Sequence, residues 1–159
     1  MMRGLLAANG VKDRKVVAAD SFSGLPAPEL QQDAGDIHHT FTELMVPESA
    51  VRANFEKYGL LDEQVVFVSG YFKHTLPQLD IAPFALVRLD GDMYESTSVA
   101  LRALYPKVAP KGFVIIDDYG AVPACKRAVD DFRSLYEIEE ALNEIDWTGV
   151  WWQKRIEPP

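Results

Sequence analysis

Short apolar runs and longer amphipathic stretches follow one another along this chain. The short runs are rich in β-branched residues and predict strands at residues 15–20, 64–70, 85–89 and 111–117. Helical spacing predicts helices at residues 2–9, 47–59, 94–108 and 123–136. Residues 143–155 predict two more strands around a turn at 146–149, as an antiparallel pair. Strands that alternate with helices predict a mostly parallel α/β sheet with both faces covered.

The third predicted helix shows the spacing most clearly. Its apolar stripe consists of Thr97, Ala100, Leu101, Leu104 and Val108. Such a stripe is typical of a helix that packs one face on a sheet.

Polar residues stand at or directly after the carboxyl end of each of the four predicted parallel strands. They are Asp20, Ser69-Gly70, Asp90-Gly91-Asp92 and Asp117-Asp118. Ligands bind such sheets at the carboxyl ends of the strands, so we expect these clusters to converge. Taken singly, Asp20 is equally well explained as a turn or helix cap, and Gly70 as an ordinary turn residue.

The aspartates after the third and fourth strands form the most informative cluster. Neighbouring carboxylates repel one another and cost stability unless a cation neutralises them. Asp90, Asp117 and Asp118 together predict an oxygen-ligand site for Mg²⁺ or a similar divalent ion.

Composition excludes several classes of partner. The chain has 159 residues, of which 48% are hydrophobic and 25% charged, and this suits one soluble domain over residues 1–159. The net charge of −8, without a Lys/Arg cluster, argues against nucleic acid or anionic lipid. No apolar run reaches membrane length. The single cysteine excludes an internal disulfide and favours a reducing, cytoplasmic location.

Other reactive or aromatic residues are expected to be structural. Cys125, inside a predicted helix, is expected to be a small buried residue and not a nucleophile. Tryptophans 147, 151 and 152 are expected to pack in the core and sheet. His38 and His39 lie in a polar segment that predicts a surface loop.

Several segments, in order along nearly the whole chain, resemble a known family. They are VVAADSFSGLP, GYFKHTLP, VRLDGDMYEST, GFVIIDDYGAVPACKRAVDDF and IDWTGVWWQK. Together they closely resemble the macrocin O-methyltransferase (TylF-type) family. The resemblance implies a Rossmann-like class I methyltransferase sheet, mostly parallel with an antiparallel C-terminal strand. It also implies S-adenosylmethionine- and Mg²⁺-dependent methylation of a sugar hydroxyl on a glycosylated small molecule or natural product.

The same resemblance assigns roles to individual residues. Asp90, Asp117 and Asp118 match magnesium ligands, and Asp90 also matches the general base. Asp20 matches the residue that hydrogen-bonds the cofactor ribose. The segments Ser21-Phe22 and Gly70-Tyr71-Phe72 match those around the adenosyl group. Substrate contacts are expected from three further residues: His38, His39 and Tyr119.

The residue after Asp92 separates this chain from related catechol methyltransferases. Those enzymes place a lysine three residues after the first metal aspartate, where this chain has Met93. A lysine base is thereby excluded at this position, and an aspartate base is favoured.

Two alternatives of other classes remain. The LDGDM segment also resembles haloacid-dehalogenase-type phosphatases, although only 27 positions separate Asp90 from Asp117. The other alternative is a truncated, non-catalytic binding or assembly protein of the methyltransferase fold.

The second alternative rests on a missing pattern. A glycine-rich loop normally precedes the ribose-binding acid by about 20 residues, and no G-x-G precedes Asp20. The first strand of the fold is therefore expected to be absent. Its loss would expose two strand edges. We expect weakened cofactor binding and a homodimer or higher homo-oligomer formed through these edges.

Overall fold

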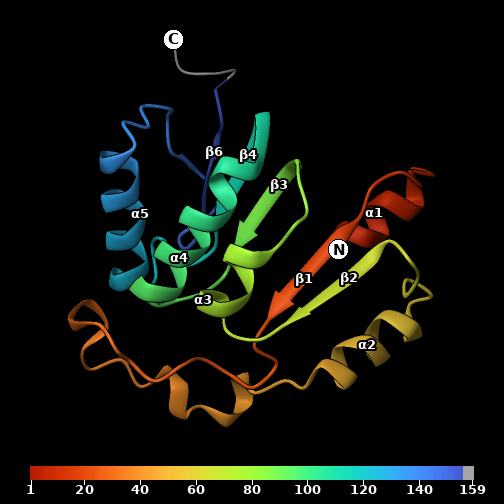
Figure 1. The fold of residues 1–159 in the computed structure, drawn as a ribbon, viewed down its shortest axis with the longest axis horizontal. Helices are drawn as coiled ribbons and strands as arrows, with labels where there is room; N and C mark the ends of the chain where they lie inside the picture. Colours follow the sequence, from red (N-terminus) through yellow and green to blue (C-terminus); the bar gives the residue numbers. More distant parts are fainter. Residues whose placement is uncertain (156–159) are drawn as a thin grey trace. The chain divides into compact units, whose positions relative to one another are not determined.

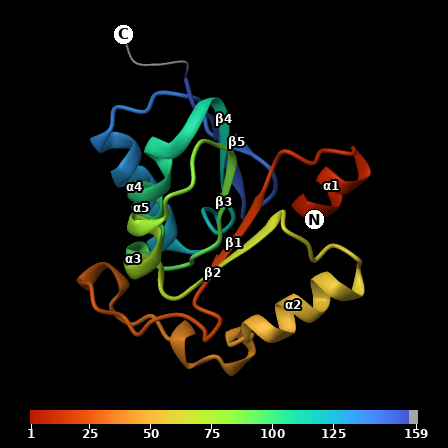
Figure 2. The same cartoon turned by 45° about the vertical axis from the view of Figure 1, so that its right-hand side comes forward.

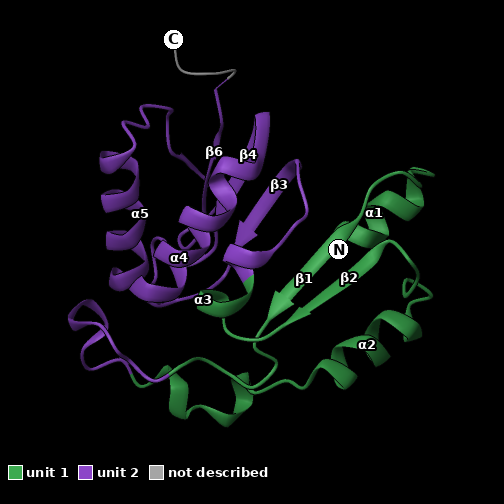
Figure 3. Cartoon of the chain, viewed as in Figure 1, with its two compact units in different colours: residues 1–26, 37–75 green, residues 27–36, 76–159 purple. Residues whose placement is uncertain are grey.

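The structure is a computed structural model that describes residues 1–155 and falls into two compact units (Figure 3). Unit 1 comprises Met1–Pro26 and Ile37–Thr75, and unit 2 comprises Ala27–Asp36 and Leu76–Pro159. None of the helices within the described residues is long and apolar enough to cross a membrane.

Unit 1 is built on a two-stranded parallel sheet (Figure 1). Its elements are α1 (Met2–Ala8), β1 (Val16–Asp20), α2 (Glu48–Lys57), β2 (Val65–Ser69) and α3 (Phe72–Thr75). Short 3-10 turns occupy His38–Thr40 and Thr42–Leu44. The Phe55 ring of α2 lies edge-on to Phe67 of β2, with centroids 5.8 Å apart, so this helix packs on the strand.

Unit 2 contains a four-stranded mixed sheet in the order β3-β4-β6-β5. The strands are β3 (Phe84–Leu89), β4 (Val108–Ile116), β5 (Asn143–Glu144) and β6 (Val150–Gln153). Strand β3 is parallel to β4, whereas β6 is antiparallel to both β4 and β5. The predicted antiparallel C-terminal pair is confirmed.

Two helices, α4 (Tyr94–Leu104) and α5 (Pro123–Leu135), cover one face of this sheet (Figure 2). Alternating strand residues such as Val87 and Leu89 face them and are buried. Trp152 of β6 is fully buried and lies beside the Tyr105 ring. On the other face, Leu86 and Phe113 keep 37% and 38% of their surface exposed. The expectation that both faces are covered stays a prediction for this part of the sheet.

Three sequence expectations need correction. Helix α4 ends at Leu104, a 3-10 turn follows at Tyr105–Lys107, and Val108 begins β4. The residue is buried as expected, but in a strand, because Pro106 interrupts the helix. Trp147 is 82% exposed, because it lies in the turn between β5 and β6.

The third correction concerns the sheet itself. The parallel strands belong to two separate sheets, and β1 is not hydrogen-bonded to β3. Within the described residues β1 pairs only with β2, and β3 only with β4.

Candidate functional site

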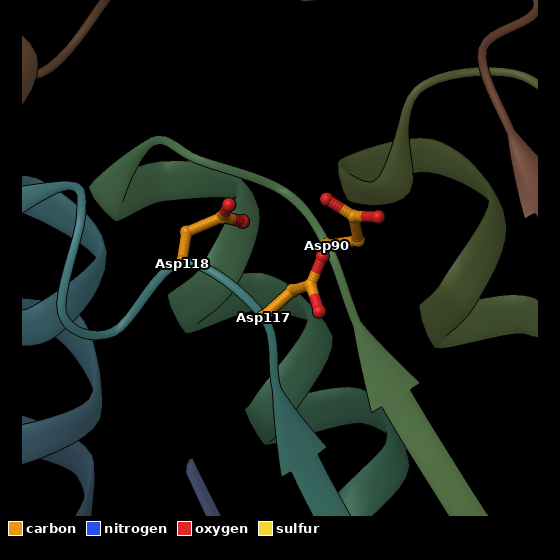
Figure 4. A group of neighbouring side chains, drawn as sticks. All are labelled: Asp90, Asp117 and Asp118. Carbon is orange, nitrogen blue, oxygen red and sulfur yellow. The ribbon is translucent and has the colours of Figure 1, made fainter. Parts of the chain in front are cut away.

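Three carboxylates gather where β3 and β4 end (Figure 4). Leu89 at the end of β3 is paired with Ile116 at the end of β4, so the residues that follow lie side by side. Asp90, Asp117 and Asp118 each offer a carboxylate oxygen, and these oxygens lie within 4.8 Å of one another. The structure therefore brings together the predicted cluster, and its role as a set of metal ligands stays a prediction.

Electrostatics in this cluster favour a bound cation. The pKa of Asp118 is raised to about 6, chiefly by burial and also by the nearby carboxylates of Asp92 and Asp90. The Asp92 amide lies 3.4 Å from the Asp118 carboxylate, so its opposing contribution is weak. A divalent ion bound here would stabilise the charged form of Asp118 and so lower its pKa again. Three hard oxygen donors of this kind fit Mg²⁺ better than a softer metal.

Arg88 on β3 contacts the same cluster, and sequence reasoning missed it. One guanidinium nitrogen lies 3.0 Å from Asp90 Oδ2, and the other donates to Asp117 Oδ2 at 2.5 Å. The alternation along β3 was the available signal, because residues two apart on a strand share a face. That rule places Arg88 near Asp90, but not near Asp117.

The segment between Asp90 and α4 is held by its surroundings. The side chain of Met93 is fully buried, so a core residue follows Asp92 directly. The α4 N-terminus has no side-chain cap from Met93. Asp33, from a distant turn of unit 2, accepts hydrogen bonds there from the amides of Tyr94 and Glu95. Sequence reasoning missed Asp33 too, and no local pattern marks it.

The predicted cofactor residues of unit 1 lie at the ends of β1 and β2. Asp20 is exposed, and its Oδ1 accepts a hydrogen bond from the amide of Phe22 at 2.7 Å. Ser21 donates its hydroxyl proton to the carbonyl of Gly24. The amide of Gly70 donates to the carbonyl of Asp20 at 2.9 Å, which joins the two strand ends.

Gly70 is required by its backbone conformation. Its φ is +132°, and an added Cβ would lie 2.9 Å from a methyl group of Thr75. Tyr71 and Phe72 follow at the start of α3, both partly exposed. The structure thus places all six predicted cofactor residues within unit 1, and their contact with a cofactor stays a prediction.

The predicted substrate residues lie in different units. His38 and His39 are in unit 1, where His38 lies edge-on to Phe41 with ring centroids 5.4 Å apart. Tyr119 is in unit 2, and its hydroxyl donates to Asp130 and accepts from Lys126, both at 2.7 Å. Tyr119 is thus already engaged by α5, and its pKa is raised mainly by burial.

Cys125 has the properties expected of a structural residue. It is buried on α5, and burial raises the pKa of its thiol to about 12. Because the thiolate is the reactive form, this cysteine is a poor nucleophile in the folded chain.

The chain is similar to known proteins over nearly its whole length. The chain is 49% identical over 158 residues to demethyldecarbamoylnovobiocin O-methyltransferase of Streptomyces niveus, covering 97% of this chain and 60% of the relative. It is 50% identical over 156 residues to 8-demethyl-8-(2,3-dimethoxy-alpha-L-rhamnosyl)-tetracenomycin-C 4'-O-methyltransferase of Streptomyces olivaceus, covering 96% and 59%. The chain thus spans about 60% of the length of these curated relatives.

Solved structures show the same fold. The O-methyltransferase NovP superposes with a TM-score of 0.94 at 47% identity, over 97% of this chain and 65% of that one. An SAH-bound methyltransferase of Podospora anserina superposes with a TM-score of 0.60 at 17% identity, over 96% of this chain and 66% of that one, and this likeness concerns the fold alone. The fold is therefore the α/β class I methyltransferase fold. Residues 1–154 match the family described as macrocin O-methyltransferase (TylF), and the chain belongs to that family.

Proposed function

We propose that this chain is an S-adenosylmethionine- and Mg²⁺-dependent O-methyltransferase that acts on a sugar hydroxyl of a glycosylated small molecule. The observation that carries the proposal is the cluster of three carboxylate oxygens within 4.8 Å at the ends of β3 and β4. Membership of the TylF family supports it. So do the names of the relatives, which are O-methyltransferases acting on a demethyldecarbamoylnovobiocin and on a rhamnosyl tetracenomycin.

Asp90, Asp117 and Asp118 would hold the metal. When bound, Mg²⁺ would orient the acceptor hydroxyl and lower its pKa. The raised pKa of Asp118 supports this assignment, because a carboxylate buried among like charges has most to gain from a cation.

The cofactor would bind through the predicted residues of unit 1. Only Oδ1 of the exposed Asp20 is engaged by the Phe22 amide, so its second oxygen can accept a hydrogen bond from a ribose hydroxyl. The positive φ of Gly70 favours glycine, so the turn after β2, where the adenosyl group is expected, carries no side chain at this position. The SAH bound by the fold relative from Podospora anserina is compatible with this proposal.

Methyl transfer would then need one proton acceptor. S-adenosylmethionine would supply the methyl group, and S-adenosylhomocysteine would be the leaving group as the carbon–sulfur bond is replaced by a carbon–oxygen bond. Asp90 would act as general base and accept the hydroxyl proton on its carboxylate. Alignment of oxygen, carbon and sulfur supplies much of the remaining acceleration.

The alternatives differ in their support. Family membership overrides the haloacid-dehalogenase comparison, which rested on LDGDM alone. A non-catalytic binding or assembly role stays open, because β1 and β3 each keep one edge unpaired within the described residues. We propose self-association through these edges as a homodimer or higher oligomer, a cytoplasmic location, and one methyltransferase-like domain across residues 1–159.

Titration calorimetry tests the proposed function without knowledge of the acceptor. The chain is titrated with S-adenosylmethionine in the presence of Mg²⁺ and again in the presence of EDTA. Cofactor binding in the first titration supports the enzyme. Absence of binding in both, with metal binding intact, supports the non-catalytic alternative.

Two aspartate variants test the roles within the cluster. Asp118→Ala should abolish most metal affinity and leave the fold intact, because it also relieves repulsion in the metal-free chain. The matched control is Asp80→Ala, which deletes an exposed carboxylate from the same unit. With an acceptor in hand, Asp90→Asn should slow methyl transfer by at least about 10²-fold. An unchanged rate at saturating Mg²⁺ would move the base to Asp92 or a histidine.

A further inference from the structure

Arg88 binds two of the three clustered aspartates at once. Its guanidinium lies 3.0 Å from Asp90 Oδ2 and 2.5 Å from Asp117 Oδ2, and its side chain is 41% exposed. The three residues come from two strands, because Asp90 follows β3 and Asp117 follows β4. Arg88 therefore links the two strand ends through their carboxylates.

A cation beside a metal site can act in two opposite ways. It can occupy the place of the metal, in which case its removal strengthens metal binding. It can also hold the ligands in position, in which case its removal weakens metal binding, typically 10–100-fold. The sign of the effect on metal affinity distinguishes the two roles.

The geometry favours the positioning role. Arg88 contacts Oδ2 of Asp90 and Oδ2 of Asp117, and each carboxylate also has a second oxygen. With Arg88 in place, one oxygen from each of the three aspartates already lies within 4.8 Å of the others. The gathering of the ligands thus does not require the guanidinium to leave.

The charge balance points in the same direction. Four carboxylates, those of Asp90, Asp92, Asp117 and Asp118, lie at this end of the sheet and repel one another. Without a cation, the like charges favour the separation of Asp90 from Asp117. A planar fork opposes this separation better than a point charge can, because it fixes two acceptors in a set geometry.

We propose that Arg88 is a positioning residue that assembles the metal site before the metal binds, by holding Asp90 and Asp117 together through the two arms of its guanidinium. This inference rests on the proposed function, since it assumes that the three aspartates bind a divalent ion. It adds a residue that the aspartate pattern alone does not contain. It requires the forked shape of the side chain as well as its charge.

Mn²⁺ binding to the whole 159-residue chain, followed by electron paramagnetic resonance of the free ion, provides the test. The variants are Arg88→Met, which removes charge and fork, and Arg88→Lys, which keeps the charge alone. Arg127→Met is the matched control, because Arg127 is an exposed arginine of unit 2 that pairs with Asp131 on α5. Circular dichroism in EDTA checks that each variant is folded. If Arg88→Met does not fold, the Mn²⁺ affinity of Arg88→Lys is compared with that of the wild type instead.

We expect the dissociation constant for Mn²⁺ to rise about 10–100-fold in Arg88→Met. Arg88→Lys should fall well short of wild-type affinity, and Arg127→Met should bind as wild type does. Equal or tighter binding by Arg88→Met would overturn the inference and make Arg88 a competitor of the metal. Wild-type affinity in Arg88→Lys would overturn the requirement for a fork. A wild-type chain that binds no Mn²⁺ would instead refute the metal site, and with it this inference.

Discussion

Asp33 provides a direct measure of how α4 is held in unit 2. Its side chain is almost wholly buried, at 2% exposure, at the end of the 3-10 turn Gln31–Asp33. Oδ1 accepts from the Tyr94 amide at 2.6 Å, and Oδ2 accepts from the Glu95 amide at 3.0 Å. The first amides of a helix have no partner within the helix, so a residue 61 positions away satisfies two of them.

The cost of removing this carboxylate can be estimated from these contacts. Loss of a side-chain cap costs about 0.5–2 kcal/mol, and a buried amide left without a partner costs about 1–3 kcal/mol. Alanine has no carboxylate to desolvate, so the variant avoids part of the cost of burying Asp33, and the net loss of stability is smaller. For Asp33→Ala we expect unit 2 to lose about 2–4 kcal/mol of unfolding free energy. Asp33→Asn keeps one acceptor oxygen, so about half of that loss should remain.

Urea denaturation followed by tryptophan fluorescence is the appropriate assay. All three tryptophans lie in unit 2, so their emission reports the unfolding of that unit even if the two units unfold separately. Gln32→Ala is the matched control, because Gln32 is exposed in the same 3-10 turn. It should change the unfolding free energy by less than about 0.5 kcal/mol.

Three results would contradict this reasoning about Asp33. If Asp33→Ala stays within about 0.5 kcal/mol of the wild type, the carboxylate does not stabilise the helix start. If Asp33→Asn is as stable as the wild type, the second hydrogen bond contributes nothing. A loss that is the same in both variants would indicate that charge, and not the number of acceptors, is what matters.

Two other predictions concern the packing of two glycines and of the buried cysteine. Gly120→Ala would place a Cβ against the carbonyl oxygen of Trp147, so it should lower the unfolding free energy by about 1–3 kcal/mol. Gly4 lies in α1 and has room for a Cβ, so Gly4→Ala should raise the unfolding free energy by about 0.5–1 kcal/mol. Equal effects of the two changes in urea denaturation would contradict this. Cys125, with its pKa raised to about 12, should resist iodoacetamide between pH 7 and 9 when folded and react when unfolded in urea, as intact mass will show. Folding favours its protonated thiol, a contribution that is lost only as pH rises above about 9. Rapid labelling of the folded chain would show that this site is open.

Local patterns were sufficient for the elements and for the residues at strand ends. A buried apolar run that ends in a carboxylate is a short-range signal: Asp20 ends β1, and Asp90 and Asp117 directly follow β3 and β4. The same logic failed at Val108, whose spacing from Leu104 fits a helix although Pro106 had already ended it. Periodicity alone gave the wrong element there, and the proline should have outweighed it.

Trp147 was misjudged for a different reason. Aromatic side chains lie in the core on average. The turn between β5 and β6, however, is stabilised by Asp146, whose Oδ1 accepts hydrogen bonds from the amides of Thr148 and Gly149. That turn leaves the indole outside. Side-chain capping of a tight turn decides which residue is exposed, and hydrophobicity does not reveal it.

Arg88 and Asp33 were missed because their partners lie far away in the sequence. Arg88 reaches Asp117 across 29 positions, and Asp33 reaches Tyr94 across 61. Each is an ordinary polar residue in its own neighbourhood. Only the pairing of β3 with β4, or the placement of a turn over the α4 start, gives either residue a role.

These two residues explain how like charges can be held close together. Asp90 is tied to Arg88, and three residues later the fully buried side chain of Met93 anchors the segment in the core. The helix that follows begins on the carboxylate of Asp33. Asp90 therefore lies on a short segment that is fixed at both ends by contacts within unit 2. This packing opposes the repulsion among the aspartates. The fold can therefore supply the arrangement that a divalent metal needs before any ion binds.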